Sequence, residues 1–284
     1  MNEIKLVSSL DESVNFISPV GDGEFLEARY VRRSPDEVIC YLSVQTGCNQ
    51  GCRMCHLTQS HQTKYRNVRM EEIFTQVKKV ITHYDSLPNK ASIVNYNFMA
   101  RGEPLSSDLI NGTDYLFEKM GYLALKSGLL PRFKISTIMP KSLDKSLMEI
   151  FPVIHPDIYY SAYSADEKVR QRWLPNAMPL EQAIGKLKEW QDHTHKIIRV
   201  HYAVIKGVND SSFQVMMLYN AFSRARLLYD VNLVYYNPFN EKFGEEGSME
   251  TVRYTWEQSG IKTSIVNRVG FDVHASCGMF YEAN

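Results

Sequence analysis

Hydrophobic side chains along the chain follow two spacings in turn, one typical of strands and one typical of helices. Segment 37–46 is a short apolar run of the kind found in buried strands, whereas in 70–84 apolar residues recur every three or four positions, as on one face of a helix. Further strands are predicted at 91–99, 133–138, 157–164, 196–205, 231–237 and 262–267, and further helices at 114–128, 141–151, 179–191, 211–229 and 248–260. This alternation indicates βαβ units, and six or seven of them predict an α/β fold built as a partial (β/α) barrel.

The first forty residues depart from this alternation. Segments 15–20 and 24–31 have strand-like patterns, and the Gly-Asp-Gly sequence between them is typical of a turn. A β-hairpin is therefore predicted here. We divide the chain into a small N-terminal β extension, residues 1–36, and a core, residues 37–284.

The composition is that of an ordinary soluble globular protein. Of 284 residues, 44% are apolar and 23% are charged, and 32 Lys and Arg balance 32 Asp and Glu. A balanced charge gives no global positive field for nucleic acid, although a local basic patch is still able to bind it. The N-terminus lacks the pattern of a signal peptide and no apolar run is long enough to span a bilayer, so we expect a cytoplasmic protein.

Three of the five cysteines lie in one stretch, CNQGCRMCHL, directly after the strand predicted at 37–46. Sites in (β/α) barrels lie at the carboxyl ends of the strands, so chemistry is expected at this place. A small number of cysteines in a reducing compartment argues against a disulfide framework and favours a metal or catalytic role. Cys48, Cys52 and Cys55 are therefore candidate metal ligands.

Three explanations of this cysteine group are open. One is a zinc ion bound by the three thiolates and His56 or His61, although structural zinc sites usually take two separated pairs of ligands. A chance grouping is the second. The third is an iron–sulfur cluster, and the C-x3-C-x2-C spacing suits it best, because three thiolates hold three irons of a [4Fe–4S] cluster and leave the fourth open for a small ligand.

The cysteine motif resembles that of the radical S-adenosylmethionine enzymes, and other motifs narrow the resemblance to the family of the RNA methyltransferases RlmN and Cfr. The resemblance extends from about residue 20 to the C-terminus. The similar motifs, in chain order, are SVQTGC (43–48), MARGEP (99–104), ST (136–137), SAY (161–163), GVND (207–210), NPF (237–239) and ASCG (275–278). Among the departures from the family pattern, Arg101 stands where a Met is usual, and Tyr163 where a His is usual.

The resemblance implies a barrel of the radical S-adenosylmethionine type, with a [4Fe–4S] cluster on the three clustered cysteines and S-adenosylmethionine as the second cofactor. The cofactor contacts that it implies are Gly102, Glu103, Ser136, Ser161, Tyr163 and Asn237. These residue types suit the role, since a glycine lets a ligand approach the backbone and a carboxylate accepts hydrogen bonds from an ammonium group. Taken singly, each also fits an ordinary turn or a satisfied polar group of the core.

The resemblance also implies catalytic residues. Cys277 matches a cysteine that is methylated by one S-adenosylmethionine and whose methyl group, activated by a second, adds to the adenine ring. A lone cysteine is otherwise most often inert packing. Glu27 takes the place of the family's proton acceptor, which has to lie within hydrogen-bond reach of the adenine. The alternative for Glu27 is a surface carboxylate on an edge strand.

Cys40 is the candidate for the family's second cysteine, which helps to resolve the crosslink between protein and RNA and ends in a disulfide with the methyl-bearing one. That cysteine normally lies seven positions before the first cluster cysteine, but Cys40 lies eight before Cys48, and Tyr41 takes the usual place. A one-residue slip in a strand turns a side chain to the other face. Because Glu27 and Tyr30 keep the family's spacing to Cys40, we expect a β-bulge after Cys40 that restores its direction, with an idle core thiol as the alternative.

These features predict a methyltransferase that modifies an adenine of ribosomal or transfer RNA, at C2 rather than at C8. The resemblance implies an electron donor such as flavodoxin or ferredoxin, a monomer, and no membrane partner. The residues before 20 are too few for the family's N-terminal accessory domain, so weaker RNA binding or another substrate is expected. Two alternatives stay open: a radical enzyme of the same core that acts on DNA, a nucleotide or a protein, and a cluster-containing nucleic-acid-binding protein without turnover.

Overall fold

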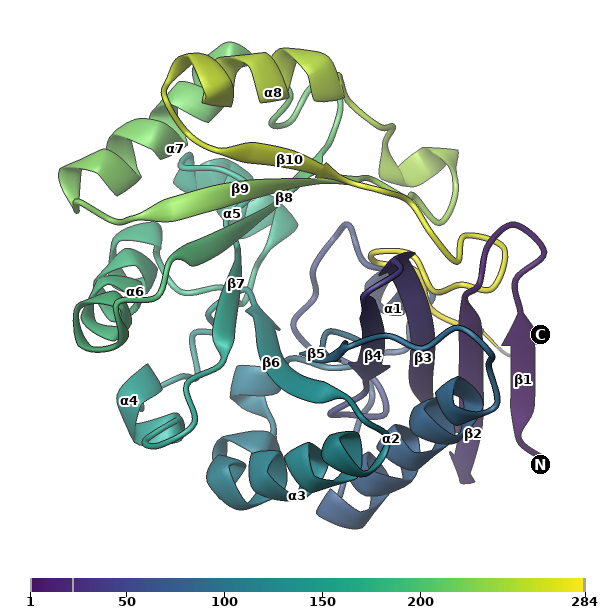
Figure 1. Ribbon diagram of the computed structural model, residues 1–284. Coiled ribbons are helices and arrows are strands. Elements are labelled where there is room, and N and C mark those ends of the chain that lie inside the picture. Colours follow the sequence, from purple (N-terminus) through teal and green to yellow (C-terminus); the bar gives the residue numbers. More distant parts are fainter. Residues whose placement is uncertain (1, 22, 283–284) are drawn as a thin grey trace.

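The protein is described here by a computed structural model, which covers residues 2–21 and 23–282 and contains one curved sheet of ten strands in sequence order (Figure 1). The strands are β1 Ile4–Val7, β2 Val14–Gly21, β3 Glu24–Ser34, β4 Glu37–Leu42, β5 Ile93–Phe98, β6 Leu130–Thr137, β7 Asp157–Ser161, β8 Ile198–Val204, β9 Tyr229–Tyr235 and β10 Thr263–Val266. Neighbours from β1 to β4 are antiparallel, and neighbours from β4 to β10 are parallel. Among the described strands none joins β10 to β1, so the barrel is open.

Helices follow the parallel strands and cover the outer face of the sheet, which leaves the inner face to surround the centre of the molecule (Figure 1). The helices are α1 His56–Gln59, α2 Met70–Asp85, α3 Thr113–Lys126, α4 Leu147–Ile150, α5 Glu167–Trp173, α6 Leu180–Thr194, α7 Ser212–Arg224 and α8 Met249–Gln258, with 3-10 turns η1 Pro104–Ser106, η2 Asp108–Ile110 and η3 Glu241–Phe243. None of the helices in the described part is both long and apolar enough to cross a membrane.

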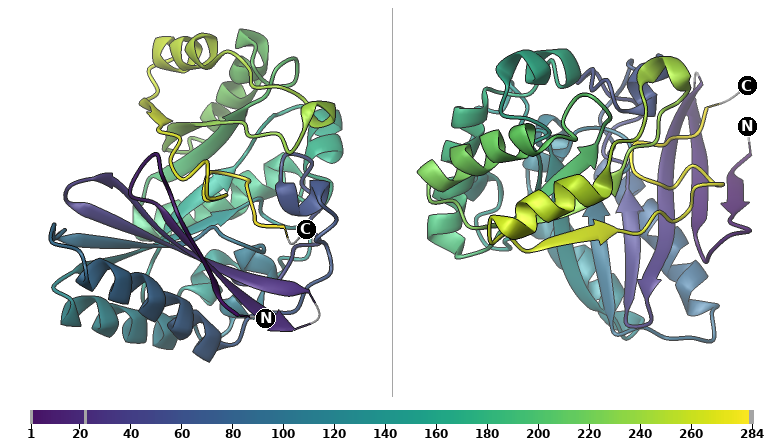
Figure 2. Two further views of the ribbon diagram at one scale, coloured as in Figure 1. Left: turned by 90° about the vertical axis from the view of Figure 1, so that its right-hand side faces the viewer. Right: turned by 90° about the horizontal axis from the view of Figure 1, so that it is seen from above.

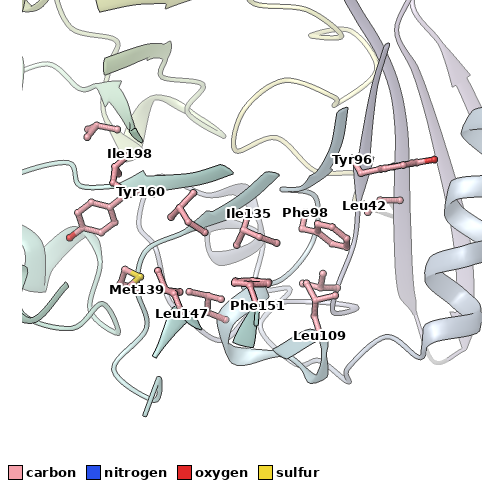
Figure 3. Close-up of a cluster of buried hydrophobic side chains, with 14 of the residues drawn as sticks. Leu42, Tyr96, Phe98, Leu109, Ile135, Met139, Leu147, Phe151, Tyr160 and Ile198 are labelled. Carbon is pink, nitrogen blue, oxygen red and sulfur yellow. The ribbon is translucent and has the colours of Figure 1, made fainter. Parts of the chain in front are cut away.

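The main hydrophobic core lies between these helices and the outer face of the sheet. Helix α2 contributes Ile73, Val77 and Val80, which recur at helical spacing and are buried against β3 and β4. Figure 3 shows part of the same core, where Phe98 of β5 and Ile135 of β6 lie beside side chains of the helical layer. Because side chains alternate along a strand, the residues between these core positions point to the inner face instead.

The predicted α/β fold with a partial barrel is confirmed, and so is the N-terminal hairpin, which β2 and β3 form; Asp22 of its turn lies outside the described residues. The helix predicted at 141–151 is much shorter. It begins only after Ser146, whose hydroxyl accepts a hydrogen bond from the Glu149 N–H at 3.2 Å while the Glu149 carboxylate accepts one from the Ser146 N–H at 2.6 Å. This reciprocal cap sets the helix start at that position. Strand β1 and helices α1 and α5 were not predicted.

The N-terminal strands extend the sheet of the core. Strand β3 pairs with β4 across the boundary proposed at residue 36. The C-terminal segment, yellow in the two views of Figure 2, returns to the same region. There the Asp272 carboxylate accepts hydrogen bonds from the Ser8 hydroxyl at 2.6 Å and the Ser9 N–H at 2.7 Å. Segments near the two ends of the described chain, residues 8–9 and 272, therefore contact each other at the surface.

Candidate active site

The inner face of the sheet and the loops at its carboxyl ends enclose a cavity of about 470 Å³. Its wall is polar at many positions and carries most of the predicted site residues. From that set the cavity is lined by Cys48, Cys52, Cys55, Gly102, Glu103, Ser136, Ser161, Tyr163 and Cys277. Three predicted residues are not among those that line it: Cys40, Glu27 and Asn237. The structure therefore brings the three clustered cysteines, five of the six implied cofactor contacts and Cys277 to one cavity.

The three clustered cysteines lie in the loop between β4 and α1 and face this cavity together. Burial raises the pKa of the Cys48 thiol to about 12 and that of the Cys55 thiol to about 11, so the protein alone does not hold these groups as thiolates. A bound metal centre supplies the positive charge that ionises such thiols. None of the described cysteines is in a disulfide.

The donor set fits a cluster better than a single ion. In the described part of the chain, no three His, Cys, Asp or Glu side chains converge as the ligands of one metal ion do. The thiolates of a [4Fe–4S] cluster bind different irons, so they need not converge on one point. His56, a candidate ligand in the zinc alternative, has its Nε2 atom 2.9 Å from the carbonyl oxygen of Asn237 and is buried there.

The loop after β5 approaches the loop that leads to Cys48 so closely that position 102 requires a glycine. Its φ angle is +99°, and a Cβ atom there would lie 2.7 Å from the Cβ atom of Gln45 and 2.9 Å from its backbone nitrogen. The next residue, Glu103, donates its N–H to Gln45 Oε1 at 3.0 Å. The loop that follows β5 therefore packs directly on the loop that leads to Cys48.

The Glu103 carboxylate is buried and joins this loop to the end of β6. It accepts hydrogen bonds from the N–H groups of Leu105 at 3.1 Å and Ile138 at 3.2 Å. Burial raises the pKa of Glu103 to about 7, while these bonds and the Thr137 hydroxyl oppose the rise. One or two further donors, such as an ammonium group in the cavity, would stabilise its charged form.

The remaining implied cofactor contacts fall into two groups. Ser136 of β6 and Ser161 of β7 face the cavity, and Tyr163 faces it from a left-handed backbone conformation, φ +56°. Asn237 was predicted to contact the cofactor, but it does not line the cavity. Its Nδ2 atom donates to the carbonyl oxygen of Cys277 at 2.9 Å, so in this structure it holds the loop that carries that cysteine.

Cys277 lies in the segment after β10, and its side chain is exposed toward the cavity. The segment is fixed on one side by Asn237 and by the His56 N–H, which donates to the Gly278 carbonyl at 2.9 Å. Gly278 has φ +74°. The surrounding walls desolvate the thiol and raise its pKa, an effect that the guanidinium groups of Arg33 and Arg29 oppose.

Cys40 does not face the cavity, so the direction predicted for its side chain is wrong. The register of β4 with β3 and with β5 is continuous from Val38 to Tyr41, and the only irregularity in the β3–β4 pair lies upstream, between Arg32 and Ser34. Cys40 therefore points to the helical layer, where it is fully buried in the hydrophobic core. Tyr41 has the inward position instead. The implied disulfide between Cys40 and Cys277 has no basis in this geometry.

Glu27 is fully buried, and its environment differs from that of the expected base. Its carboxylate accepts hydrogen bonds from Arg29 at 2.8 Å, Arg101 at 2.8 Å and Asn15 at 2.9 Å. Burial opposes the charged form, but the two guanidinium groups outweigh this cost, so the pKa of Glu27 lies below its usual value. The role of Glu27 as a base remains a prediction, and its oxygens are directed at these partners.

A cationic and aromatic patch on the inner wall was not predicted. Arg33 donates to the Tyr41 hydroxyl at 3.0 Å, and Lys134 lies with its Nζ atom 5.7 Å from the ring centroid of Tyr159. The Tyr159 and His201 rings are 4.9 Å apart. Within the described residues neither Arg33 nor Lys134 forms an ion pair. We call these five residues the inner patch.

The inner patch is positively charged. Burial, together with the charges of Arg33 and Lys134, lowers the pKa of His201 to about 4, so the ring is neutral near pH 7 and the two long side chains carry the charge. The signal that would have found the patch is strand alternation. Lys134 and Tyr159 lie two residues before Ser136 and Ser161 on their strands, and therefore face the same way.

Comparison with known proteins finds similar chains among RNA methyltransferases. No family model matches the chain. A probable dual-specificity RNA methyltransferase RlmN of Shouchella clausii is 25% identical over 98% of this chain and 78% of its own length, and that of Clostridium novyi is 27% identical over 96% and 77%. The ribosomal RNA large subunit methyltransferase Cfr of Staphylococcus aureus is 28% identical over 84% of this chain and 68% of its own length.

Solved structures show the same fold. A radical SAM methyltransferase from Sphaerobacter thermophilus superposes with a TM-score of 0.80 over 98% of this chain and 80% of that chain, at 18% identity. SuiB of Streptococcus suis, solved with S-adenosylmethionine, superposes with a TM-score of 0.52 over 83% of this chain and 48% of that chain, at 16% identity. The chain is therefore similar over most of its length to the RlmN and Cfr RNA methyltransferases, and it shares the fold of the radical SAM methyltransferase from Sphaerobacter thermophilus.

Proposed function

We propose that this protein is a radical S-adenosylmethionine methyltransferase that transfers a methyl group to an adenine of RNA through Cys277. The observation that carries the proposal is the shared cavity. The three clustered thiols, Cys277 and the Gly102 loop all line it. The names of the relatives support an RNA substrate. Transfer to C2 rather than C8, on ribosomal or transfer RNA, is the finer part of the proposal.

Cys48, Cys52 and Cys55 would hold a [4Fe–4S] cluster, which supplies the electron that cleaves S-adenosylmethionine. The chain's own groups near these thiols suit an amino acid moiety. Glu103 provides a carboxylate for its ammonium group, and the hydroxyl of Ser136 is a donor for its carboxylate or ribose. Gly102 keeps this part of the wall free of a side chain.

Cys277 would carry the methyl group. Transfer would form a bond from its sulfur to the methyl carbon, break the bond between that carbon and the sulfonium sulfur, release the thiol proton to water and leave a thioether on the protein. The carbonyl oxygen of Cys277 is held by Asn237 at 2.9 Å, so the loop presents the sulfur to the cavity from a fixed backbone. A neutral thioether there needs no ion-pair partner.

The inner patch supports an anionic substrate. Among the described residues Arg33 and Lys134 are two cations that form no ion pair, and Tyr41 and Tyr159 offer ring faces beside them. Cations that contact phosphate and aromatic rings that stack on bases are the usual means of binding single-stranded RNA. A cytoplasmic monomer that receives its electron from a flavodoxin or ferredoxin completes the proposal.

The test is mass spectrometry of the nucleosides of ribosomal and transfer RNA from cells with and without the gene. The proposal predicts one methyladenosine that is present only when the gene is present, and its retention time against 2-methyladenosine and 8-methyladenosine standards decides the position. If no methyladenosine changes, the RNA assignment fails, and a radical enzyme of the same core that acts on another substrate becomes the better explanation.

A further inference from the structure

We propose that Glu27, Arg29 and Arg101 form a buried clamp that fixes the Cys277 segment relative to the loop of the cluster cysteines. In this proposal the three are positioning residues for transfer through Cys277, and Glu27 is not a base. The role of the clamp in methyl transfer rests on the proposed function, whereas the contacts that form the clamp do not depend on it.

The clamp consists of two guanidinium groups that share one carboxylate. Arg101 Nη1 lies 2.8 Å from Glu27 Oε1, and Arg29 Nη2 lies 2.8 Å from Glu27 Oε2. The three side chains are almost inaccessible, with at most 3% of their surface exposed. Buried charges are stable only when each has a partner, so removal of one member leaves the others unpaired and loosens the whole set.

The clamp holds the backbone just after Cys277. Arg29 Nη2 donates to the carbonyl of Met279 at 2.7 Å, and the N–H of Tyr281 donates to Glu27 Oε1 at 3.1 Å. Between these two, the ring of Phe280 has its centroid 4.8 Å from the Arg29 guanidinium carbon. Residues 279–282 have no regular secondary structure, so tertiary contacts order them, and those of the clamp act together with the Gln62 Nε2 atom, which donates to the Tyr281 carbonyl at 3.1 Å.

Arg101 joins this segment to the cluster loop. Its Nε atom donates to the carbonyl of Thr46 at 2.8 Å, two residues before Cys48, while its Nη1 atom reaches the Tyr281 carbonyl at 3.3 Å. Arg101 also immediately precedes Gly102. One guanidinium group therefore ties three walls of the cavity together: the loop that leads to Cys48, the Gly102 loop and the segment of Cys277.

The same contacts argue against a direct chemical role for Glu27. Each of its oxygens already accepts two hydrogen bonds, Oε1 from Arg101 and Tyr281 and Oε2 from Arg29 and Asn15. In the described chain Glu27 is not among the residues that line the cavity. A base has to reach the proton that it takes, and this carboxylate is directed at its own partners.

The first test measures how well Cys277 is held, without requiring catalysis. The variants are Arg101→Met, which keeps an unbranched side chain, and Glu27→Gln, which keeps the shape of the carboxylate. The matched control is Arg253→Met, which breaks an exposed ion pair with Glu257 on α8. Full-length protein with its cluster is treated anaerobically with iodoacetamide, and the alkylation of each cysteine peptide is followed by mass spectrometry.

The clamp predicts that Cys277 is alkylated about tenfold faster in both variants than in the wild type, because local opening of the 279–282 segment becomes easier, and at an unchanged rate in the control. Amide exchange at Tyr281 should rise in parallel. If Arg101→Met fails to fold, Glu27→Gln decides alone. Unchanged alkylation and exchange in a folded Glu27→Gln protein would overturn the proposal.

The second test separates positioning from general damage. In Glu27→Gln, reductive cleavage of S-adenosylmethionine should stay within about threefold of the wild type, whereas the methylation of Cys277 should fall about tenfold or more. An equal loss of both activities would show that the side chains only stabilise the fold, and would overturn the positioning role. Methylation that fails in the wild type while alkylation still responds to the variants would refute the proposed function and leave the clamp standing.

Discussion

Two cysteines in this chain lie outside the cluster motif, and their surroundings are opposite. Cys277 is on an irregular segment, held at its backbone by side chains of other elements, with its sulfur exposed to the cavity. Cys40 is in the middle of β4, held by the sheet, with its sulfur buried in the core beneath α2. Both are candidates by sequence alone, but only Cys277 is placed where chemistry is possible.

The difference comes from how each element sets the direction of a side chain. In a strand, successive side chains point to opposite faces of the sheet. Tyr41 therefore points into the cavity, and Cys40 points to the hydrophobic core on the other face. In an irregular segment the direction is set by tertiary contacts, which for Cys277 are the Asn237 side chain and the clamp. A residue in a loop can therefore still face the site after a one-residue shift in sequence, whereas the same shift turns a residue in a strand to the other face of the sheet.

The largest expected effect is on the residue that faces the cavity. Cys277→Ala should lower transfer of the methyl group by at least about a thousandfold, because the group that carries it is lost. Cleavage of S-adenosylmethionine should persist, since the cluster ligands are untouched. Nucleoside mass spectrometry and chromatography of 5′-deoxyadenosine measure the two quantities. Substantial transfer by this variant would show that Cys277 is not the carrier.

The second effect is a difference in thiol reactivity within the wild-type protein. Alkylation of Cys40 should be at least about a hundredfold slower than that of Cys277, because Cys40 is inaccessible and burial raises its pKa far above the usual range. The rate at Cys277 should rise with pH until its own raised pKa is passed, since the thiolate is the nucleophile. Equal rates at the two sites in folded protein would contradict the placement of Cys40.

The third prediction concerns RNA binding by the inner patch, which includes Tyr41 and lies on the cavity side of the sheet. Arg33→Ala and Lys134→Ala should each raise the KM for RNA about tenfold, because each removes a cation that meets a phosphate, and should leave S-adenosylmethionine cleavage unchanged. Lys126→Ala, an exposed lysine on α3, is the matched control. The salt dependence of binding should weaken in the two patch variants and not in the control.

The smallest effect is expected at Cys40. Cys40→Ala should lower the free energy of unfolding by about 1–2 kcal/mol, as other truncations in a packed core do, with no change in turnover. Denaturant unfolding and a multiple-turnover assay measure the two outcomes. An accumulation of protein crosslinked to RNA in this variant would instead assign Cys40 the resolving role that its position opposes.

The order of strands and helices was predictable because hydrophobic period and turn residues are local signals. Segment 70–84, for example, became α2 within one residue at its end. The grouping of Cys48, Cys52 and Cys55 at one cavity was equally predictable, since their spacing is short and their loop follows a strand. The face of the sheet to which Cys40 points was not predictable. One extra residue between Cys40 and Cys48 can be accommodated by a bulge or by an unbroken strand, and the local sequence does not decide between them.

The clamp and the inner patch were missed for a different reason. Arg101 was noticed only as a departure from the family pattern, and its partner Glu27 is 74 positions away. Contacts of this kind depend on how β3, β5 and the C-terminal segment meet, which is set by the whole fold. The inner patch has a local signal in strand alternation, but Arg33, Lys134 and Tyr159 are brought together only by the pairing of the strands.

The most direct test of the account is the mass of the Cys277 peptide from protein reconstituted anaerobically with its cluster and supplied with S-adenosylmethionine that carries a deuterated methyl group. The account predicts that this peptide gains one labelled methyl-derived group on the sulfur of Cys277, and that the Cys40 peptide gains none. An unmodified Cys277 in protein that contains iron and sulfide and cleaves the cofactor would contradict it.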